Sequence, residues 1–225
     1  MAILRATEET GVYEIEGLGT RIRLIEWRAG MFYDSVAFSS TLTAGTQQFL
    51  FINLQNKFRQ HTNLDNNAGR LPALNELICN KIGAHIVQAF GNAVPNDSDI
   101  IKVAHGGQLR VVVNTTRLIF DQPLYTAQSG YGITGSTTRN ATGVVTTGVP
   151  SAAAAPQLLV AQPIGPNDGI GGDITFNANT WLGPSGASIL STDGVGKPSM
   201  TPALDGSGIV VTGFLDGLIK KPQGA

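Results

Sequence analysis

The stretch Leu109-Arg-Val-Val-Val-Asn-Thr-Thr-Arg-Leu-Ile-Phe120 decides the fold class of this sequence. It is long and rich in β-branched residues, which favour a pleated, partly buried strand. His105-Gly-Gly107 stands before it and Asp121-Gln-Pro123 after it, and such clusters are typical of turns. We therefore predict one strand over Leu109–Phe120.

Similar patterns on both sides of this stretch predict seven further strands. Each contains alternating or continuous apolar residues, and Gly, Pro, Asn or Asp clusters bound most of them. The predicted strands are Thr20–Arg28, Phe32–Phe38 after a turn signal at Ala29-Gly30, Gln47–Leu54, Leu77–Val87, Gln157–Ile164, Asp173–Asn177 and Ile209–Leu215. The sequence thus predicts an all-β fold of about eight strands, and we expect a single jelly-roll β-sandwich.

The stretch Leu71–Phe90 fits either a helix or a strand. Its apolar residues recur every four positions, which suits one helix face, but the even spacing also suits one strand face. Gly83 and the β-branched isoleucines weaken the helix. We therefore favour a strand over Leu77–Val87. The recurring residues are Leu74, Ile78, Ile82, Ile86 and Phe90.

Long loops and one short helix complete the expected fold. Asp97 or Ser98 can cap a helix over Asp97–Ala104, which the following glycines would end. Ser129–Val149 is rich in Gly, Thr and Ser, so we expect a long loop or insertion near 126–156, with Ser151–Pro156 as a linker. No repeat of about 20–50 residues is visible, and we expect one domain over 1–225.

Composition narrows the possible functions. Among 225 residues, 14% are charged, against a usual share of about 25%, while 28 glycines and 11 prolines suit turns between strands. A net charge of −1 provides no basic field for nucleic acid. Gln122–Ile219 carries about seven charged side chains. Either much of its surface faces other protein, or hydroxyl-rich loops keep it in solution.

Residues for catalysis or metal binding are scarce. The three histidines, His61, His85 and His105, contain no His-x-His pair of the kind that a cupin metal site needs, and His85 is interpreted as structural. Cys79 is the only cysteine, so it forms no intrachain disulfide and is expected to be a small buried hydrophobe. We assign no catalytic, metal or cofactor residue.

Two weaker motifs do not change this conclusion. Gly130–Gly135 matches the dinucleotide fingerprint as a string, but Ser136–Gly143 is a poor helix to follow it. Asp97 and Asp99 could bind a cation with Asn96, although a helix cap or solvated turn is the simpler interpretation. The sequence therefore predicts a protein that is not an enzyme.

Three stretches resemble a pattern in small virion proteins of bacterial viruses. The first is Phe58–Asp65, which contains Thr62-Asn-Leu64, followed by Gly69–Pro72 and the apolar segment from Leu77. The second runs from Gly107 to Leu124, and the third is Gly208–Gly217. This resemblance to jelly-roll coat proteins implies a capsid subunit of a tailless icosahedral virus of bacteria or archaea.

The resemblance implies self-assembly into an icosahedral shell. The expected partners are copies of the same chain and other virion proteins, without specific nucleic acid, and the location is the virion after synthesis in the host cytoplasm. No signal peptide is visible, and no apolar run reaches the roughly 18 residues of a membrane span.

The alternative is a carbohydrate- or receptor-binding β-sandwich of a fibre or lectin type. Sugars commonly stack on an exposed aromatic ring, and Trp27 and Trp181 are the only tryptophans. Trp181 is the better candidate of the two, although a role as a core plug is the simpler interpretation.

Overall fold

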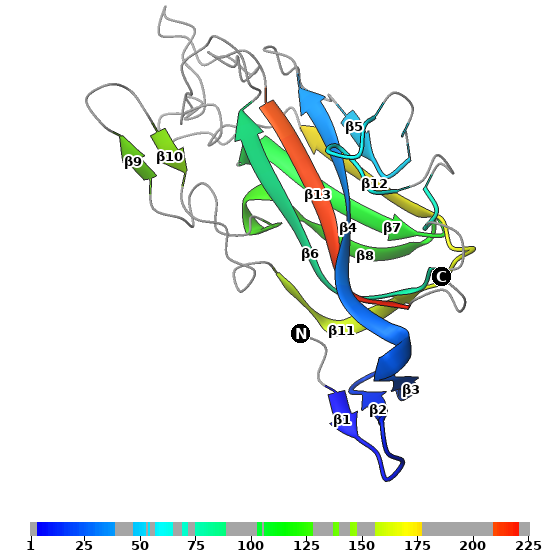
Figure 1. Cartoon of the computed structure of the whole chain (residues 1–225). Coiled ribbons are helices and arrows are strands. Elements are labelled where there is room, and N and C mark those ends of the chain that lie inside the picture. The colour runs from blue at the N-terminus through cyan, green and yellow to red at the C-terminus, as the bar shows by residue number, and fades with distance from the viewer. Residues whose placement is uncertain are drawn as a thin grey trace, which may run out of the picture.

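The computed structural model describes residues 4–38, 47–52, 54, 57–64, 69–71, 75–88, 103–104, 106–127, 137–139, 145–147, 156–176 and 209–220. This part of the chain is all-β, and its strand pairs are all antiparallel (Figure 1). The predicted fold class is confirmed.

Eight strands form two facing four-stranded sheets (Figure 1). In spatial order, the first sheet contains β11 (Gln157–Ile164), β6 (Leu77–Gln88), β13 (Ile209–Lys220) and β4 (Trp27–Phe38). The second contains β5 (Gln47–Leu50), β12 (Ile170–Phe176), β7 (Gly107–Val113) and β8 (Arg117–Pro123). The described residues form a β-sandwich.

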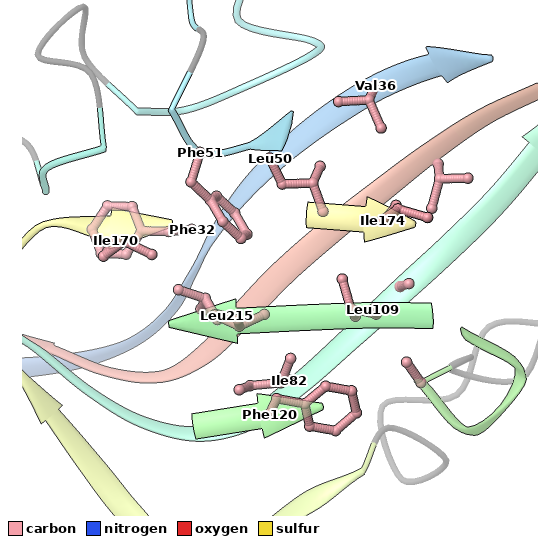
Figure 2. Close-up of a cluster of buried hydrophobic side chains, with 14 of the residues drawn as sticks. Phe32, Val36, Leu50, Phe51, Ile82, Leu109, Phe120, Ile170, Ile174 and Leu215 are labelled. Atoms are coloured by element: carbon pink, nitrogen blue, oxygen red, sulfur yellow. The ribbon is translucent and has the colours of Figure 1, made fainter. Parts of the chain in front are cut away.

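The core fills the space between these sheets (Figure 2). Phe32 and Leu215 on the first sheet and Leu109 and Ile174 on the second belong to one buried cluster. Each such side chain contributes about 1.5–3 kcal/mol by leaving water. Burial of the alternate residues of each strand therefore fixes which face of each sheet turns inward.

Two small sheets lie outside the sandwich. β1 (Leu4–Ala6), β2 (Val12–Ile15) and β3 (Thr20–Arg23) form the N-terminal sheet, whose Ile15 and Ile22 belong to a second buried cluster with Ile78 and Ala161. β9 (Thr137–Arg139) and β10 (Val145–Thr147) form a hairpin, and 3₁₀ turns span Leu24–Glu26 (η1) and Leu124–Ala127 (η2).

The last strand, β13, is central in its sheet, with a buried inner face and a partly buried outer face. It pairs with β4 on one side and β6 on the other over its whole length. Val211 and Leu215 are fully buried in the core, while Phe214 on the opposite face is only 6% exposed. The Phe214 ring stacks on His85, with centroids 5.0 Å apart. This agrees with the pattern of Ile209–Leu215, which has apolar residues on both faces.

Phe214 also explains the glycine in β6. Gly83 lies directly opposite Phe214, and a Cβ at Gly83 would approach the ring atom Cζ to 2.3 Å. The ring therefore occupies the space that any larger residue would need. Leu77–Gln88 is a strand as favoured from the sequence, so the helical alternative was wrong.

The stretch Leu109–Phe120 is two strands, not one. β7 ends at Val113, and β8 begins at Arg117 and pairs back on it. Asn114 and Thr115 have φ values of 53° and 60°, and a tight hairpin turn requires such positive φ at both central residues. Asn114 was the missed signal, because asparagine tolerates this conformation better than most residues.

The predicted turn at Ala29-Gly30 was also wrong. β4 runs straight through it, and the break lies earlier, at η1, which divides the predicted strand Thr20–Arg28. Gly30 lies opposite Gly217, where a Cβ would approach Ile219 Cδ1 to 2.7 Å. Gly30 therefore permits a close side-chain approach instead of a turn.

Other strands begin or end at residues different from those predicted from the sequence. β5 stops at Leu50, because Phe51 takes a φ of 66° outside the ladder. β12 begins at Ile170 and ends at Phe176, and β13 extends to Lys220. The first two strands of the N-terminal sheet were missed because neither exceeds four residues.

The predicted loops and helix fall largely outside the described residues. Val103 and Ala104, at the end of the predicted helix Asp97–Ala104, are helical and buried, while 97–102 are not described. The predicted loop Ser129–Val149 contains the hairpin β9–β10, and of the linker Ser151–Pro156 only Pro156 is described.

Prediction for Gly83 and Phe214. Gly83→Ala should destabilise the protein by about 1–3 kcal/mol, since the added methyl group overpacks against the Phe214 ring. The same change in a Phe214→Ala background should cost much less, because the clashing ring is gone. Urea unfolding of the four proteins in this double-mutant cycle measures the coupling. If the two substitutions changed the free energy of unfolding additively, the Phe214 ring would not restrict the size of residue 83.

Candidate functional site

Cys79 and His85 both have structural surroundings. Cys79 is fully buried in the core, and burial raises the pKa of its thiol to about 12, so it remains a protonated, unreactive thiol. The prediction of a buried hydrophobe is confirmed. His85 is half-buried against Phe214, and burial lowers the pKa of its imidazole. The neutral ring therefore packs as part of the sheet surface.

Of the remaining sequence candidates, only His61 and Trp27 lie within the described residues. His61 lies in a turn, where its Nδ1 accepts a hydrogen bond from Phe58 N at 3.4 Å. His105, Asn96–Asp99, Gly130–Gly135 and Trp181 lie outside the described residues. Among the residues that the structure describes, no group of three or more His, Cys, Asp or Glu side chains could hold a metal ion.

Trp27 does not form an open platform for a sugar. Its ring is partly buried against the second hydrophobic cluster, and Lys220 Nζ lies 6.0 Å from its centroid. The described part of the chain therefore gives no support to Trp27 as a sugar-stacking residue.

A hollow of the described structure follows the outer edge of β4. This β4 groove has a volume of about 560 Å³, within the usual size range of small-ligand sites. Its lining residues come from β4, from the segment 54–64 and from the end of β13. They are Arg28, Ala29, Gly30, Met31, Phe32, Tyr33, Leu54, Lys57, Arg59, Thr62, Asn63, Leu64, Asn75 and Ile219.

Thr62 and Asn63 form one wall by acting as an extra strand on β4. Tyr33 N donates to Asn63 Oδ1 at 2.8 Å, and Asn63 Nδ2 donates to the Met31 carbonyl at 2.8 Å. Thr62 Oγ1 donates to the Tyr33 carbonyl at 3.0 Å. These bonds satisfy backbone groups that an edge strand would otherwise leave free. This gives a structural role to the Thr62-Asn-Leu64 stretch.

A buried ion pair anchors the same segment. Asp34 is fully buried, and both of its carboxylate oxygens accept hydrogen bonds from Lys57 Nζ, at 2.8 and 2.7 Å. Asp34 Oδ2 also accepts a bond from Phe51 N at 2.8 Å. A buried carboxylate needs such partners, because desolvation of an unpaired charge is costly. Asp34 therefore ties the chain after β5 to the first sheet.

Two guanidinium groups remain available in the β4 groove. Arg28 and Arg59 are exposed, and no ion pair forms between either of them and a carboxylate of the described residues. None of the described lining residues is Asp or Glu, and the charge of Lys57 is offset by Asp34. The groove is therefore positively charged, although the whole chain has a net charge of −1. Sequence reasoning missed it because Arg28 and Arg59 are far apart along the chain.

A smaller hollow of about 170 Å³ lies beside a β-bulge in β6. Lys81 pairs with Asp216 and Cys79 with Gly217, so Asn80 is the extra residue between them. Bulges re-aim side chains, and here Asn80 lines the hollow with its buried Oδ1 lacking a hydrogen-bond partner. A trapped water molecule would satisfy this oxygen.

Every edge strand of the sandwich carries an exposed large apolar side chain. They are Met31 on β4, Leu159 on β11, Phe49 on β5 and Leu118 on β8. Leu159 is fully exposed, because it lies where β11 departs from the register of β6 between Gln157 and Gln162. An exposed apolar edge strand is prone to pair with other chains, whereas single exposed apolar side chains are common on any protein surface.

No protein-family model matches this chain, and a search of curated proteins finds no significant match. Within the described part of the chain, no helical segment has the length and apolar character to cross a bilayer.

Prediction for the Asp34–Lys57 pair. Lys57→Met should destabilise the protein by about 3–5 kcal/mol, because it leaves the Asp34 carboxylate buried without its cation. Adding Asp34→Asn should recover much of this loss, since the amide carries no charge and its oxygen can still accept from Phe51 N. Thermal unfolding measures both variants. Equal stability of the single and double variants would contradict the role of the pair.

The hydrogen bonds of Asp168 predict a pH dependence of stability. Gly165 N and Asn114 Nδ2 donate to the Asp168 carboxylate at 2.8 and 2.7 Å, and these bonds lower the pKa of the carboxyl group below the ordinary value of 3.8. The lowered pKa contributes stability above pH ~4, which is lost as the pH falls through the folded-state pKa. Asp168→Asn should therefore flatten the acid limb of a stability-versus-pH curve measured by urea unfolding. An unchanged acid limb would contradict this linkage.

Proposed function

We propose that this protein is a non-enzymatic structural subunit of a viral capsid, which assembles with copies of itself. The observation that carries the proposal is the exposed apolar side chain on each edge strand of the sandwich, together with the order in which the strands pair. Virion localisation and other virion proteins as partners belong to the same proposal.

The strand order supports a jelly roll. Within the sandwich, the first strand pairs with the last (β4 with β13), the second with the seventh (β5 with β12), the third with the sixth (β6 with β11) and the fourth with the fifth (β7 with β8). This describes one long antiparallel ribbon. The contacts β6–β13 and β7–β12 then divide the ribbon into two sheets. Eight strands wrapped in this way form the jelly roll found in capsid and lectin domains and in cupins.

The surface favours a capsid over the other uses of this fold. A cupin metal site needs a group of metal-binding side chains, and the residues that the structure describes contain no such group. Leu118 and Leu159 lie on opposite sheets, each on an edge strand, so one subunit can contact neighbours on more than one side. Closed assemblies are built from such repeated contacts between identical chains.

The β4 groove favours a second function, a carbohydrate- or receptor-binding module. Its volume of about 560 Å³ suits a small ligand, and Asn75 and Arg59 supply polar groups along it. Glycan-array binding by a chain that remains monomeric would support this function over the first.

Prediction for assembly. Purified protein should form rings, sheets or shells in negative-stain electron microscopy. Leu118→Asp and Leu159→Asp should each abolish or reduce these assemblies, because a carboxylate would be buried at an apolar contact. Asn167→Asp is the matched control, since it adds the same charge at an exposed turn.

The outcomes separate the two functions. A wild-type chain that stays monomeric by size-exclusion chromatography at high concentration would overturn the structural proposal. Assemblies that persist in both leucine variants would show that these strand edges are not the contact surfaces.

A further inference from the structure

The β4 groove has the charge to receive carboxylates. Arg28 and Arg59 carry charges that no ion pair with a described residue neutralises. A guanidinium group binds a carboxylate through two parallel hydrogen bonds, and this geometry makes Arg suited to anion recognition. Two such groups in one groove match a ligand that presents two acidic side chains.

The same chain offers such a ligand at its N-terminal sheet. Glu8 and Glu9 are the only two adjacent acidic residues in the sequence. Both are exposed in the turn between β1 and β2, which Figure 1 shows at the end of the N-terminal sheet that points away from the sandwich. A projecting acidic turn of this kind is accessible to a second molecule.

The turn is preformed but weakly held by its own charges. Thr7 Oγ1 donates to the Val12 carbonyl at 2.7 Å, and Val12 N donates to the Glu9 carbonyl at 3.2 Å. The only salt bridge of the turn among the described residues joins Glu9 to Arg23 at 3.7 Å, with side chains 62% and 65% exposed. An ion pair this exposed contributes little, so Glu9 can exchange it for a better partner.

We propose that the β4 groove binds the Glu8–Glu9 turn of a second copy of this chain. This inference rests on the proposed self-assembly and names its contact chemistry: Arg28 and Arg59 of one copy pair with two glutamates of the next. The contact joins different surfaces of the two copies. Such head-to-tail contacts build rings when the rotation closes and extended arrays when it does not.

Charge reversal in the full-length chain tests this contact. The groove variant Arg28→Glu/Arg59→Glu and the turn variant Glu8→Lys/Glu9→Lys should each weaken association by about tenfold or more, since like charges would then meet. Sedimentation velocity at low ionic strength measures the association. Added salt should weaken the wild-type association, because charge pairs at an accessible contact are screened.

Variants in which both charged surfaces are reversed distinguish the loss of this contact from misfolding of the chain. The quadruple variant, with both surfaces reversed, should associate within about threefold of wild type, and so should a mixture of the groove and turn variants. Arg70→Glu/Arg110→Glu is the matched control, because it makes the same charge change at two exposed arginines outside the groove. This control should associate like wild type.

The results distinguish this inference from the proposed function. Wild-type assembly that persists in the groove variant would overturn the inference and leave the structural role intact. If association is lost in the groove variant but not in the turn variant, Glu8–Glu9 is not the segment that occupies the groove. If the quadruple variant does not regain association, the inference is also overturned. A wild-type chain that never associates would overturn both this inference and the proposed function.

Discussion

The central position of β13 between β4 and β6 is the constraint on which the rest of the sandwich depends. This strand of 12 residues joins β4, from the start of the chain, to β6. Its inward side chains, Val211 and Leu215, contribute to the core, and Phe214 covers Gly83 on the other face. Because side chains alternate along a strand, a shift of one residue would exchange these two faces. The paired burial therefore fixes the register of three strands together.

The same arrangement leaves β4 at an edge, and the edge determines the candidate site. An uncovered edge invites uncontrolled pairing with other chains. Here Asn63 and Thr62 occupy the free backbone groups, and the Asp34–Lys57 pair fixes the segment that carries them. The segment that protects the edge also forms one wall of the groove, so Arg59 is held in the same groove as Arg28. Protection of the edge and formation of a charged groove thus have one structural cause.

The exposed apolar side chains on the other edge strands would contribute to association in a different way from the charged groove. Leu118, Phe49 and Leu159 lie on strands β8, β5 and β11, whose outer sides no other strand of the described structure covers. Apolar contact gives affinity without direction, whereas charge pairs give orientation and select the partner. A subunit that carries both kinds of surface can associate strongly and still in a defined geometry.

The sequence by itself determined the all-β class and the apolar pattern on both faces of Ile209–Leu215, since these follow from local alternation of apolar residues. It also determined that Cys79 is a buried thiol. It misassigned Leu109–Phe120 because the turn signal at Asn114 was missed, and Ala29-Gly30 because the Ile219 contact of Gly30 depends on a strand from the far end of the chain. Only the tertiary structure placed Arg28 and Arg59 in one groove and paired Asp34 with Lys57. Neither pair leaves a periodic signal, because contacts between distant residues arise when the sheets pack and not along the chain.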